Sequence, residues 1–202
     1  MTRRLTFLLP AAALALLGLG LMATTGSGSK GKEKRTGTAA RALLKSADGR
    51  AVAKVSLRER RNGNVAVLVR ARGLEPGFHG FHIHETALCE PQSFTSAGGH
   101  HKQGAQDHGA HAGDMPPLLV TADGKARAAF VTDSFGIAEL VADDGSAVMI
   151  HVGRDNLANI PPRYHSHVPD ASSTTFGPDA DTLKTGDSGD RFACGVVQAR
   201  GR

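Results

Sequence analysis

The chain has 202 residues and a formal net charge of +5. All of this excess lies in the first 37 residues, since residues 38–202 hold 18 basic and 18 acidic residues. This equal number of basic and acidic residues argues against a nucleic-acid binder, which would be expected to carry a basic patch on its folded domain. With 25 Gly, 9 Pro, no Trp and one Tyr, the composition favours one turn-rich domain with a core of Val, Leu, Ile, Ala and Phe.

The N-terminal segment has the pattern of an export signal. Arg3 and Arg4 precede an apolar run from Leu5 to Met22, which is shorter than a comfortable membrane span of about 20 residues. An uncleaved membrane anchor is the alternative. We expect export to the periplasm or cell envelope or secretion, and the N-terminal segment could associate the chain with the envelope. The predicted parts are an export signal at 1–25, a Gly/Ser/Lys-rich linker at 26–37 and a folded domain at 38–202.

Short runs of apolar or alternating residues, separated by Gly-containing turn signals, predict an all-β domain. Eight such strands, joined by hairpin turns, make a sandwich or a closed barrel. The turn signals include Ala47-Asp-Gly-Arg50, Asn62-Gly-Asn64, Ala122-Asp-Gly-Lys125 and Asp143-Asp-Gly145. The predicted strands are 39–46, 50–58, 64–72, 79–85, 118–122, 126–132, 146–152 and 192–198, with 65–69 and 147–150 expected to be well buried.

Two stretches, about 86–117 and 153–191, do not have strand patterns. Loops of that length in a compact domain are usually functional or disordered. We therefore expect the chemistry of this protein to lie in these two loops.

Histidine is concentrated in one part of the chain. Seven of the ten histidines lie between Phe78 and Asp114, and three of them fall in His79-Gly-Phe-His82-Ile-His84. On a strand, His82 and His84 leave one face while the two apolar residues beside them leave the other. Imidazoles projecting from one face of a strand suit a transition metal. The alternative is a surface strand whose polar residues happen to be histidines.

Cys89 and Cys194 are the only cysteines. In an exported chain such a pair predicts a disulfide. A bridge that closes a loop of about 100 residues stabilises by roughly 4–5 kcal/mol in the chain-entropy model. Two thiolate metal ligands are the alternative. A bridge would pin the first long loop to the last predicted strand.

Several motifs in order along residues 39–198 resemble those of copper/zinc superoxide dismutases of the bacterial exported type. The resemblance implies a flattened, eight-stranded Greek-key barrel with two long functional loops. It also implies dismutation of superoxide to oxygen and hydrogen peroxide by redox cycling of a His-ligated copper beside a structural zinc. The motifs are the histidine-rich hexapeptide, Thr95-Ser-Ala-Gly-Gly-His100, His111-Ala-Gly-Asp114, Ile150-His151 and Gly189-Asp-Arg191-Phe-Ala-Cys194-Gly-Val196.

Carried over residue by residue, the resemblance implies two adjoining metal sites. All-imidazole donation suits copper in both oxidation states, and three imidazoles with one carboxylate make a closed zinc set. The implied copper ligands are His82, His84, His100 and His151. The implied zinc ligands are His100, which bridges the two metals, His108, His111 and Asp114.

The resemblance implies further roles outside the ligand sets. Asp155 would link a copper ligand, His82, to a zinc ligand, His108, and so fix the orientation of both rings. Arg191 would receive the superoxide anion through its guanidinium group, and His100 would supply a proton. His79 would be structural. Lys184 and Arg154 would lie at the rim, either as helpers that attract the anion or as plain solvated charges.

The sequence departs from the family pattern in the zinc loop. Only two residues separate His108 from His111, where many relatives have a longer excursion, so a copper-only site with weak or absent zinc is an alternative. His101 occupies a position that is often aromatic and could compete as a ligand, and His165 and His167 have no assigned role.

We expect a monomer or a homodimer. A copper carrier on the same barrel is the rival function, but a carrier needs neither a bridging His100 nor Arg191; an inert adhesion domain is a third interpretation.

Overall fold

The computed structural model describes residues 38–104, 106–161, 163 and 176–200. All of them belong to one compact unit, residues 36–202. The elements in chain order are β1 (Ala39–Ser46), β2 (Ala51–Glu59), β3 (Val65–Arg72), β4 (Gly77–His79), β5 (Phe81–His84), η1 (Thr95–Ala97), β6 (Leu118–Val120), β7 (Lys125–Thr132), α1 (Ile137–Leu140), β8 (Ala147–His151), α2 (Ala180–Thr185), β9 (Arg191–Val196) and β10 (Gln198–Ala199).

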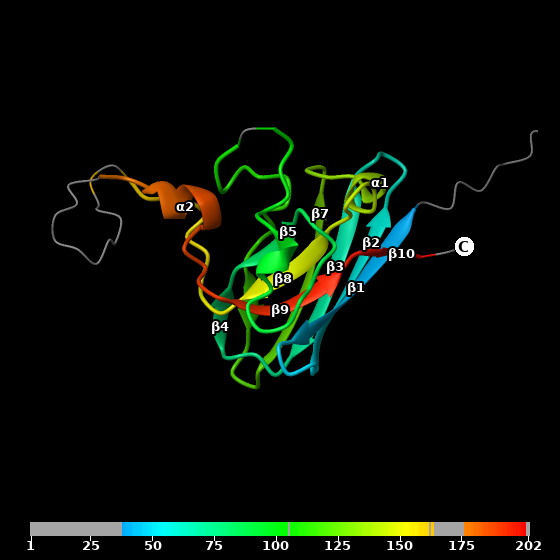
Figure 1. Ribbon diagram of the computed structural model, residues 1–202, viewed down its shortest axis with the longest axis horizontal. Coiled ribbons are helices and arrows are strands. Elements are labelled where there is room, and N and C mark those ends of the chain that lie inside the picture. Colours follow the sequence, from blue (N-terminus) through cyan, green and yellow to red (C-terminus); the bar gives the residue numbers. More distant parts are fainter. Residues whose placement is uncertain (1–37, 105, 162, 164–175, 201–202) are drawn as a thin grey trace, which may run out of the picture. The chain divides into compact units, whose positions relative to one another are not determined.

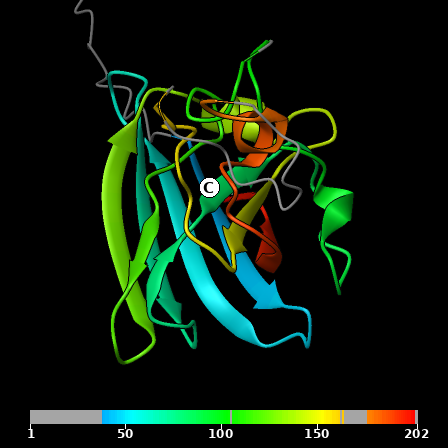
Figure 2. The ribbon, with the colours of Figure 1, turned by 90° about the vertical axis from the view of Figure 1, so that its left-hand side faces the viewer.

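The strands form one large, curled antiparallel sheet and one small sheet. In the large sheet the order is β5-β8-β9-β1-β2-β3-β7, and β10 pairs with β1; the small sheet pairs β4 with β6. Non-consecutive neighbours such as β9 and β1 are the crossovers of a Greek-key arrangement. Figure 1 shows the curvature of the sheet, with α2 at the left of the view and α1 at the upper right near β2, and Figure 2 shows the long, curved strands of the same sheet from its left-hand side.

Alternation along β1, β2 and β3 explains why these strands form one wall. Their buried positions alternate with exposed ones, so each strand turns one face to the core and one to solvent. Val65, Val67 and Val69 are buried, but Leu68 is 42% exposed. The prediction that the whole segment 65–69 is buried is therefore wrong, because every second side chain points outward.

β5 and β8 differ, because every residue of both strands is buried. Phe81, Ile83, Val148 and Ile150 pack into the main core. On the opposite face, Ala147 and Met149 join a smaller apolar cluster with Phe94, Ala97 and Cys194. The loop after β5 therefore covers the outer face of this part of the sheet, and the histidines of β5 are enclosed between layers.

The all-β prediction is confirmed, and most predicted strands match the observed ones to within a residue or two. The exception is the predicted strand 79–85, which Gly80 divides into β4 and β5 in different sheets. A Cβ at Gly80 would lie 2.5 Å from Cβ of Ser188, so only glycine fits where the chain changes sheets. Three short helices, η1, α1 and α2, also lie where the sequence pattern predicted no helix.

The described residues contain no helix long and apolar enough to cross a bilayer. The predicted export signal and linker lie outside the described residues.

Candidate metal centre

β5 carries His82 and His84 on one face. Both side chains are buried, at 0% and 1% exposure, although histidine is a polar residue. Phe81 and Ile83 point into the main core, as the two-residue period of a strand requires. The strand therefore uses its apolar face for stability and offers two enclosed imidazoles on the other.

β8 and β9 contribute His151 and Arg191, which are cross-strand partners. The register shifts between Ile150 and His151, so an irregularity in the ladder lies directly before the histidine. The Nδ1 atom of His151 donates to the carbonyl oxygen of Gly189 at 3.0 Å. This bond fixes the ring and leaves Nε2 as its free nitrogen.

His100 reaches the site because the first long loop pairs with the open edge of β5. The backbone N–H of Ile83 donates to Gly113 at 2.8 Å, and that of His101 donates to Ile83 at 2.8 Å. Isolated bridges set His84 opposite His100 and His82 opposite Asp114. Edge-strand hydrogen-bonding groups, which would otherwise be unpaired, thus dock the loop and its side chains in register.

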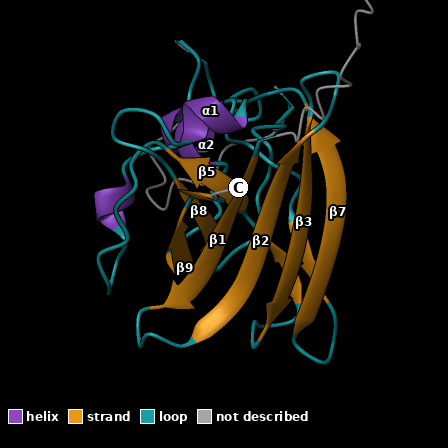
Figure 3. Cartoon of the chain, turned by 90° about the vertical axis from the view of Figure 1, so that its right-hand side faces the viewer, coloured by secondary structure: helices purple, strands orange, loops and turns teal. Residues whose placement is uncertain are grey.

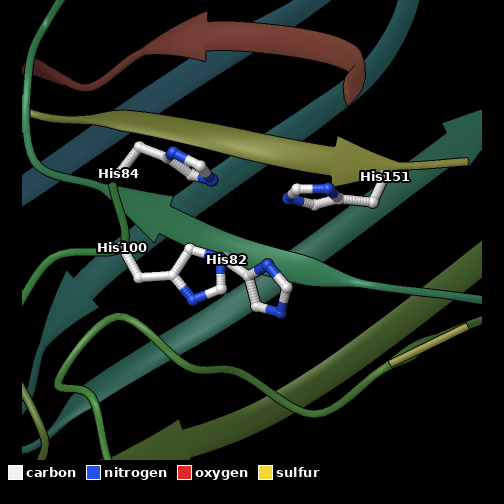
Figure 4. A group of neighbouring side chains, drawn as sticks. All are labelled: His82, His84, His100 and His151. Carbon is white, nitrogen blue, oxygen red and sulfur yellow. The ribbon is translucent and has the colours of Figure 1, made fainter. Parts of the chain in front are cut away.

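The rings of His82, His84, His100 and His151 surround a common space (Figure 4). One nitrogen from each ring lies within 4.8 Å of the others. Ligands on opposite sides of an ion at about 2.0–2.1 Å are roughly 4 Å apart, so small side-chain movements bring all four into range. The buried atoms without a hydrogen-bond partner are His82 Nδ1, His84 Nε2, His100 Nε2 and His151 Nε2, together with Gln106 Oε1, among the described residues.

The second nitrogen of the three strand histidines is fixed by a hydrogen bond. His82 Nε2 donates to Asp155 at 2.6 Å, and His84 Nδ1 donates to the Gly98 carbonyl at 3.0 Å. The unpartnered nitrogen of each ring therefore carries a lone pair, which is what a metal requires. Burial lowers the pKa of His82 to about 4 and that of His151 to about 3, and holds the pKa of His84 well below its ordinary value. These rings stay neutral at pH 7.

A second set of donor atoms adjoins the first through His100. Its Nδ1 lies 2.9 Å from Asp114 Oδ1, 3.3 Å from His108 Nδ1 and 3.4 Å from His111 Nδ1. Asp114 Oδ1 in turn lies 3.2 Å and 3.4 Å from those two nitrogens. The edges of a tetrahedron around an ion at about 2.0–2.1 Å are roughly 3.3 Å long, so five of the six edges match a closed zinc set.

His82 also lies within ligand range of His100, His108 and Asp114. It has no atom to offer this second set, however. Its Nε2 is held by Asp155, and its Nδ1 is one of the unpartnered nitrogens of the first set. His111 therefore completes the second set better than His82 does.

The short spacing between His108 and His111 is accommodated by a tight turn around Asp114. The second oxygen of this carboxylate, Oδ2, accepts hydrogen bonds from the backbone N–H groups of Gly109 at 2.7 Å and His111 at 3.0 Å. His111 Nε2 donates to the Gln106 carbonyl at 2.9 Å, which directs Nδ1 toward His100. One carboxylate therefore both shapes the turn and faces the donor set.

Asp155 connects the two donor sets, because it accepts hydrogen bonds from one histidine of each. Its Oδ2 accepts from His82, and its Oδ1 accepts from His108 Nε2 at 2.8 Å and from the backbone of Leu157 at 2.7 Å. Burial would raise the pKa of Asp155, but the bonds from His108 and His82 outweigh burial and hold it below its usual range. Burial likewise lowers the pKa of His108, yet Asp114 and Asp155 outweigh it and raise the pKa to about 9.

Arg191 lies beside the first set, at the start of β9. Its Nη1 donates to the Phe94 carbonyl and its Nη2 to the Gly98 carbonyl, both at 2.6 Å. Burial lowers the pKa of Arg191, and the charge of Glu85 opposes this shift. Two fixed carbonyls therefore hold a charged guanidinium group in one orientation.

The predicted disulfide between Cys89 and Cys194 is present, with the two Cα atoms 5.6 Å apart. Cys194 belongs to β9 and packs beside Phe94, Ala97 and Met149. The bridge therefore attaches the loop that supplies the Phe94 and Gly98 carbonyls to the strand that supplies Arg191. The alternative of two thiolate ligands is wrong, because both sulfurs are in the bridge.

The remaining singled-out residues lie outside the two donor sets. His79 Nδ1 is 2.7 Å from the His151 carbonyl and its Nε2 is 2.8 Å from that of Glu75. His101 turns away from the donor sets, and its Nε2 lies 2.7 Å from Glu139 Oε1. Lys184 and Arg154 are exposed, and neither makes an ion pair with the described residues. His165 and His167 lie outside the described residues.

Fold and site together define a β-sheet metalloprotein with two adjoining histidine-rich donor sets. The chain matches the family model for copper/zinc superoxide dismutase (SODC) over residues 51–197. It is 37% identical over 191 residues to the Cu-Zn superoxide dismutase of Mycobacterium tuberculosis, covering 88% of this chain and 78% of that protein. It is 39% identical over 169 residues to the corresponding protein of Mycolicibacterium paratuberculosis, covering 77% and 72%.

Among solved structures, the Cu/Zn superoxide dismutase from Brucella abortus matches with a TM-score of 0.58 and 29% identity, covering 79% of this chain and 99% of that chain. The chain belongs to the copper/zinc superoxide dismutase family. It converts superoxide to oxygen and hydrogen peroxide, with copper and zinc as its cofactors.

Sequence reasoning missed the residues that act through their backbone. Gly98 and Gly189 supply carbonyls to His84 and His151, and Gln106 supplies one to His111. Gly186, with φ of +64°, lies against Asp155 and His108, and a Cβ there would collide with both. The glycines next to the histidine motifs were the only sequence signal for these backbone contacts. The sequence does not show which histidine each carbonyl accepts from.

Proposed function

We propose that His82, His84, His100 and His151 bind the copper ion of this enzyme. The observation that carries the proposal is the set of four buried ring nitrogens that face one space without a hydrogen-bond partner. An unsatisfied buried polar atom is costly, and four together imply a shared occupant that accepts four lone pairs. Four neutral imidazoles suit copper, since they serve both of its oxidation states.

His100, His108, His111 and Asp114 would bind zinc. The proposal is supported by five of the six donor-atom separations, which lie between 2.9 and 3.4 Å, as expected for a tetrahedral set. Without a cation, His108, whose pKa is raised to about 9, would keep a proton on Nδ1 facing Asp114. Zinc would take the place of this proton and hold the far side of the His100 ring.

Asp155 would orient one ligand of each metal. Because it accepts from Nε2 of both His82 and His108, it selects the tautomer in which Nδ1 is free on both rings. Its own negative charge also makes the two imidazoles more basic ligands. The carboxylate is therefore a positioning group that acts through the two histidines.

Arg191 would bind and orient the superoxide anion. Its guanidinium group is held by the Phe94 and Gly98 carbonyls beside the first donor set. A fixed cation beside a site attracts a small anion and raises its capture rate. Lys184 and Arg154 would add to this positive potential at the rim.

Copper, when bound, supplies the one-electron chemistry that oxidises one superoxide ion and reduces the next. The protein supplies the position of the anion and a proton. His100 Nε2 is the atom at which this proton can be held, because Nδ1 of the same ring faces the zinc set. Arg191 would hold the anion beside the copper donor set, and water would supply the second proton of hydrogen peroxide.

The chain would act outside the cytoplasm. We propose an export signal at 1–25, a linker at 26–37 and the enzyme domain at 38–202, located in the periplasm or cell envelope or secreted, as a monomer or homodimer. The apolar run from Leu5 to Met22 and the disulfide support export, because disulfides persist in oxidising compartments. An N-terminal segment that is not cleaved would anchor the chain to the envelope.

Elemental analysis of the mature protein tests the two-metal proposal. We expect one copper and one zinc ion per chain, and superoxide consumption that cyanide or a chelator abolishes. Copper without zinc would contradict the zinc set, and consumption without copper would contradict the first set. N-terminal sequencing of the secreted chain tests the export signal, since an intact Met1 would argue for a retained anchor.

A further inference from the structure

The outward face of the wall made by β1, β2, β3 and β7 is strongly basic. Figure 3 shows these four strands side by side, with β5 and β8 behind them. Among the exposed positions of the four strands there is no acidic residue. The exposed basic residues are Arg41, Lys45, Lys54, Arg58, Arg70, Arg72, Lys125 and Arg127. The balanced charge of residues 38–202 therefore hides a segregation of charge that the sequence count did not reveal.

The register places like charges directly opposite each other. Lys54 pairs with Arg70, Arg70 pairs with Arg127, and Arg72 pairs with Lys125. Only Lys125 of these residues makes an ion pair within the described part of the chain, with Asp123 at 2.7 Å. Like charges in cross-strand pairs destabilise a sheet. A row of three such residues, Lys54, Arg70 and Arg127, is therefore a cost to folding that an external anion would relieve.

The same face is hollowed and partly apolar. Lys54, Arg70, Arg72, Lys125 and Arg127 surround an open depression of about 320 Å³. Beside them, Leu43, Leu68 and Val131 are 46%, 42% and 41% exposed. Cationic side chains interleaved with exposed aliphatic ones match a surface whose anionic groups lie next to an apolar layer.

We propose that this basic face docks on an anionic phospholipid bilayer. The choice of a membrane over a nucleic acid rests on the proposed export of the chain, because an exported protein meets lipid phosphates rather than DNA. The metal centre is built from β5, β8, β9 and the long loops, so docking through β1, β2, β3 and β7 leaves it accessible. The enzyme would thereby be concentrated where superoxide leaves or reaches the membrane.

Cosedimentation of the mature protein, without the proposed export signal at 1–25, with vesicles tests the proposal. We expect binding to vesicles of equal parts phosphatidylglycerol and phosphatidylcholine, none to phosphatidylcholine alone, and release as sodium chloride is raised. The triple variant Lys54→Glu, Arg70→Glu, Arg127→Glu should bind the anionic vesicles at least ~10-fold more weakly. The triple variant Lys54→Gln, Arg70→Gln, Arg127→Gln gives a milder loss and guards against misfolding of the first.

A matched control makes the same change in net charge in the proposed linker, away from the basic face. The variant Lys30→Glu, Lys32→Glu, Lys34→Glu should keep vesicle binding within about twofold of the unchanged chain. All variants should keep the superoxide turnover of the unchanged protein, so a failure of docking is distinct from a failure of the enzyme assignment. Equal binding to neutral vesicles, a greater loss in the Lys30–Lys34 control, or face-dependent binding of duplex DNA in place of vesicles would overturn the proposal.

Discussion

Arg191 and His84 donate hydrogen bonds to the same carbonyl oxygen, that of Gly98. The Nη2 atom of Arg191 lies 2.6 Å from this oxygen, and Nδ1 of His84 lies 3.0 Å from it. The guanidinium group and one imidazole of the first donor set are therefore fixed by one backbone group. The disulfide from Cys89 to Cys194 joins the surrounding loop to β9, the strand that carries Arg191.

The replacement Arg191→Ala should lower superoxide turnover by about tenfold or more while leaving copper content unchanged, because steering by a fixed cation raises capture rates by 10–10³. The control Arg191→Lys keeps the charge but cannot donate to both carbonyls in the same plane, so its rate should be intermediate. Stopped-flow measurement of superoxide decay and copper analysis check both variants. An alanine variant as fast as the unchanged enzyme would exclude the proposed role.

Asp114→Asn should lower zinc occupancy more than copper occupancy. The amide keeps the size of the side chain but removes the negative charge that faces His100, His108 and His111. Metal analysis of the purified variant gives the ratio directly, and Asp123→Asn in an exposed turn serves as the control. If copper is lost first, the zinc assignment is wrong.

Asp155→Asn should lower the affinity for copper and the affinity for zinc together. An asparagine has one acceptor oxygen in place of two, so it turns an N–H toward His82 or His108, and without the negative charge both imidazoles become less basic ligands. Loss of such an outer partner typically costs about 10–100-fold in metal affinity. The control is Asp187→Asn, whose carboxylate accepts from Thr182 and Asn156 in the same loop region. Competition titrations with a chelator give the affinities, and equal values for the two variants would refute the positioning role.

The fold could be predicted from the sequence because its strands follow the two-residue period. Residues such as Val65, Val67 and Val69 alternate cleanly, and glycines in the turns mark where each hairpin reverses. The sequence did not predict that the histidine-rich strand divides at Gly80, because the contact with Ser188 that requires glycine comes from a segment about 100 residues away.

The sequence motifs identified which side chains of the site face one another, but not the backbone carbonyls that fix the orientation of those side chains. Period two alone predicts that His82 and His84 share a face. The carbonyls of Gly98, Gln106 and Gly189 carry no side-chain signal, and their partners are set by tertiary contacts. The basic face was hidden for the same reason, since pairs such as Lys54 and Arg70 become neighbours only through strand register.

Gly186→Ala should lower zinc occupancy and stability together. Gly186 has φ of +64°, where a residue with a Cβ is strained by about 1–2 kcal/mol, and the new methyl group would press on Asp155 and His108. Gly49→Ala is the matched control, since Gly49 has φ of +81° and open space around its Cβ position. Both variants should lose stability in urea denaturation, but only Gly186→Ala should lose zinc. Equal zinc content in the two would show that the contact with the Asp155–His108 pair is unimportant.

The stability of the metal-free protein should be greatest near pH 6.5. The folded-state pKa values of His82, His84 and His151 are lowered, to about 4 and about 3 for the first and last. The unfolded chain therefore binds protons more readily, and stability falls as the pH drops below about 6.5, by about 1.4 kcal/mol per pH unit for each proton. Asp114 and Asp155, with lowered pKa values, add a further loss only below about pH 4.

His108 contributes to the pH dependence of stability with the opposite sign. Its pKa is raised to about 9, so its stabilisation is complete below pH 6.5 and is lost as the pH rises toward 9. Zinc must displace this proton from the imidazole, so zinc affinity should rise with pH up to about 9. Urea denaturation of the metal-free protein at several pH values and calorimetric titration with zinc in buffers of different ionisation enthalpy check the two signs. Stability that rises steadily from pH 5 to pH 9, or zinc binding that releases no proton at pH 7, would show that His108 is not held in its charged form by Asp114 and Asp155.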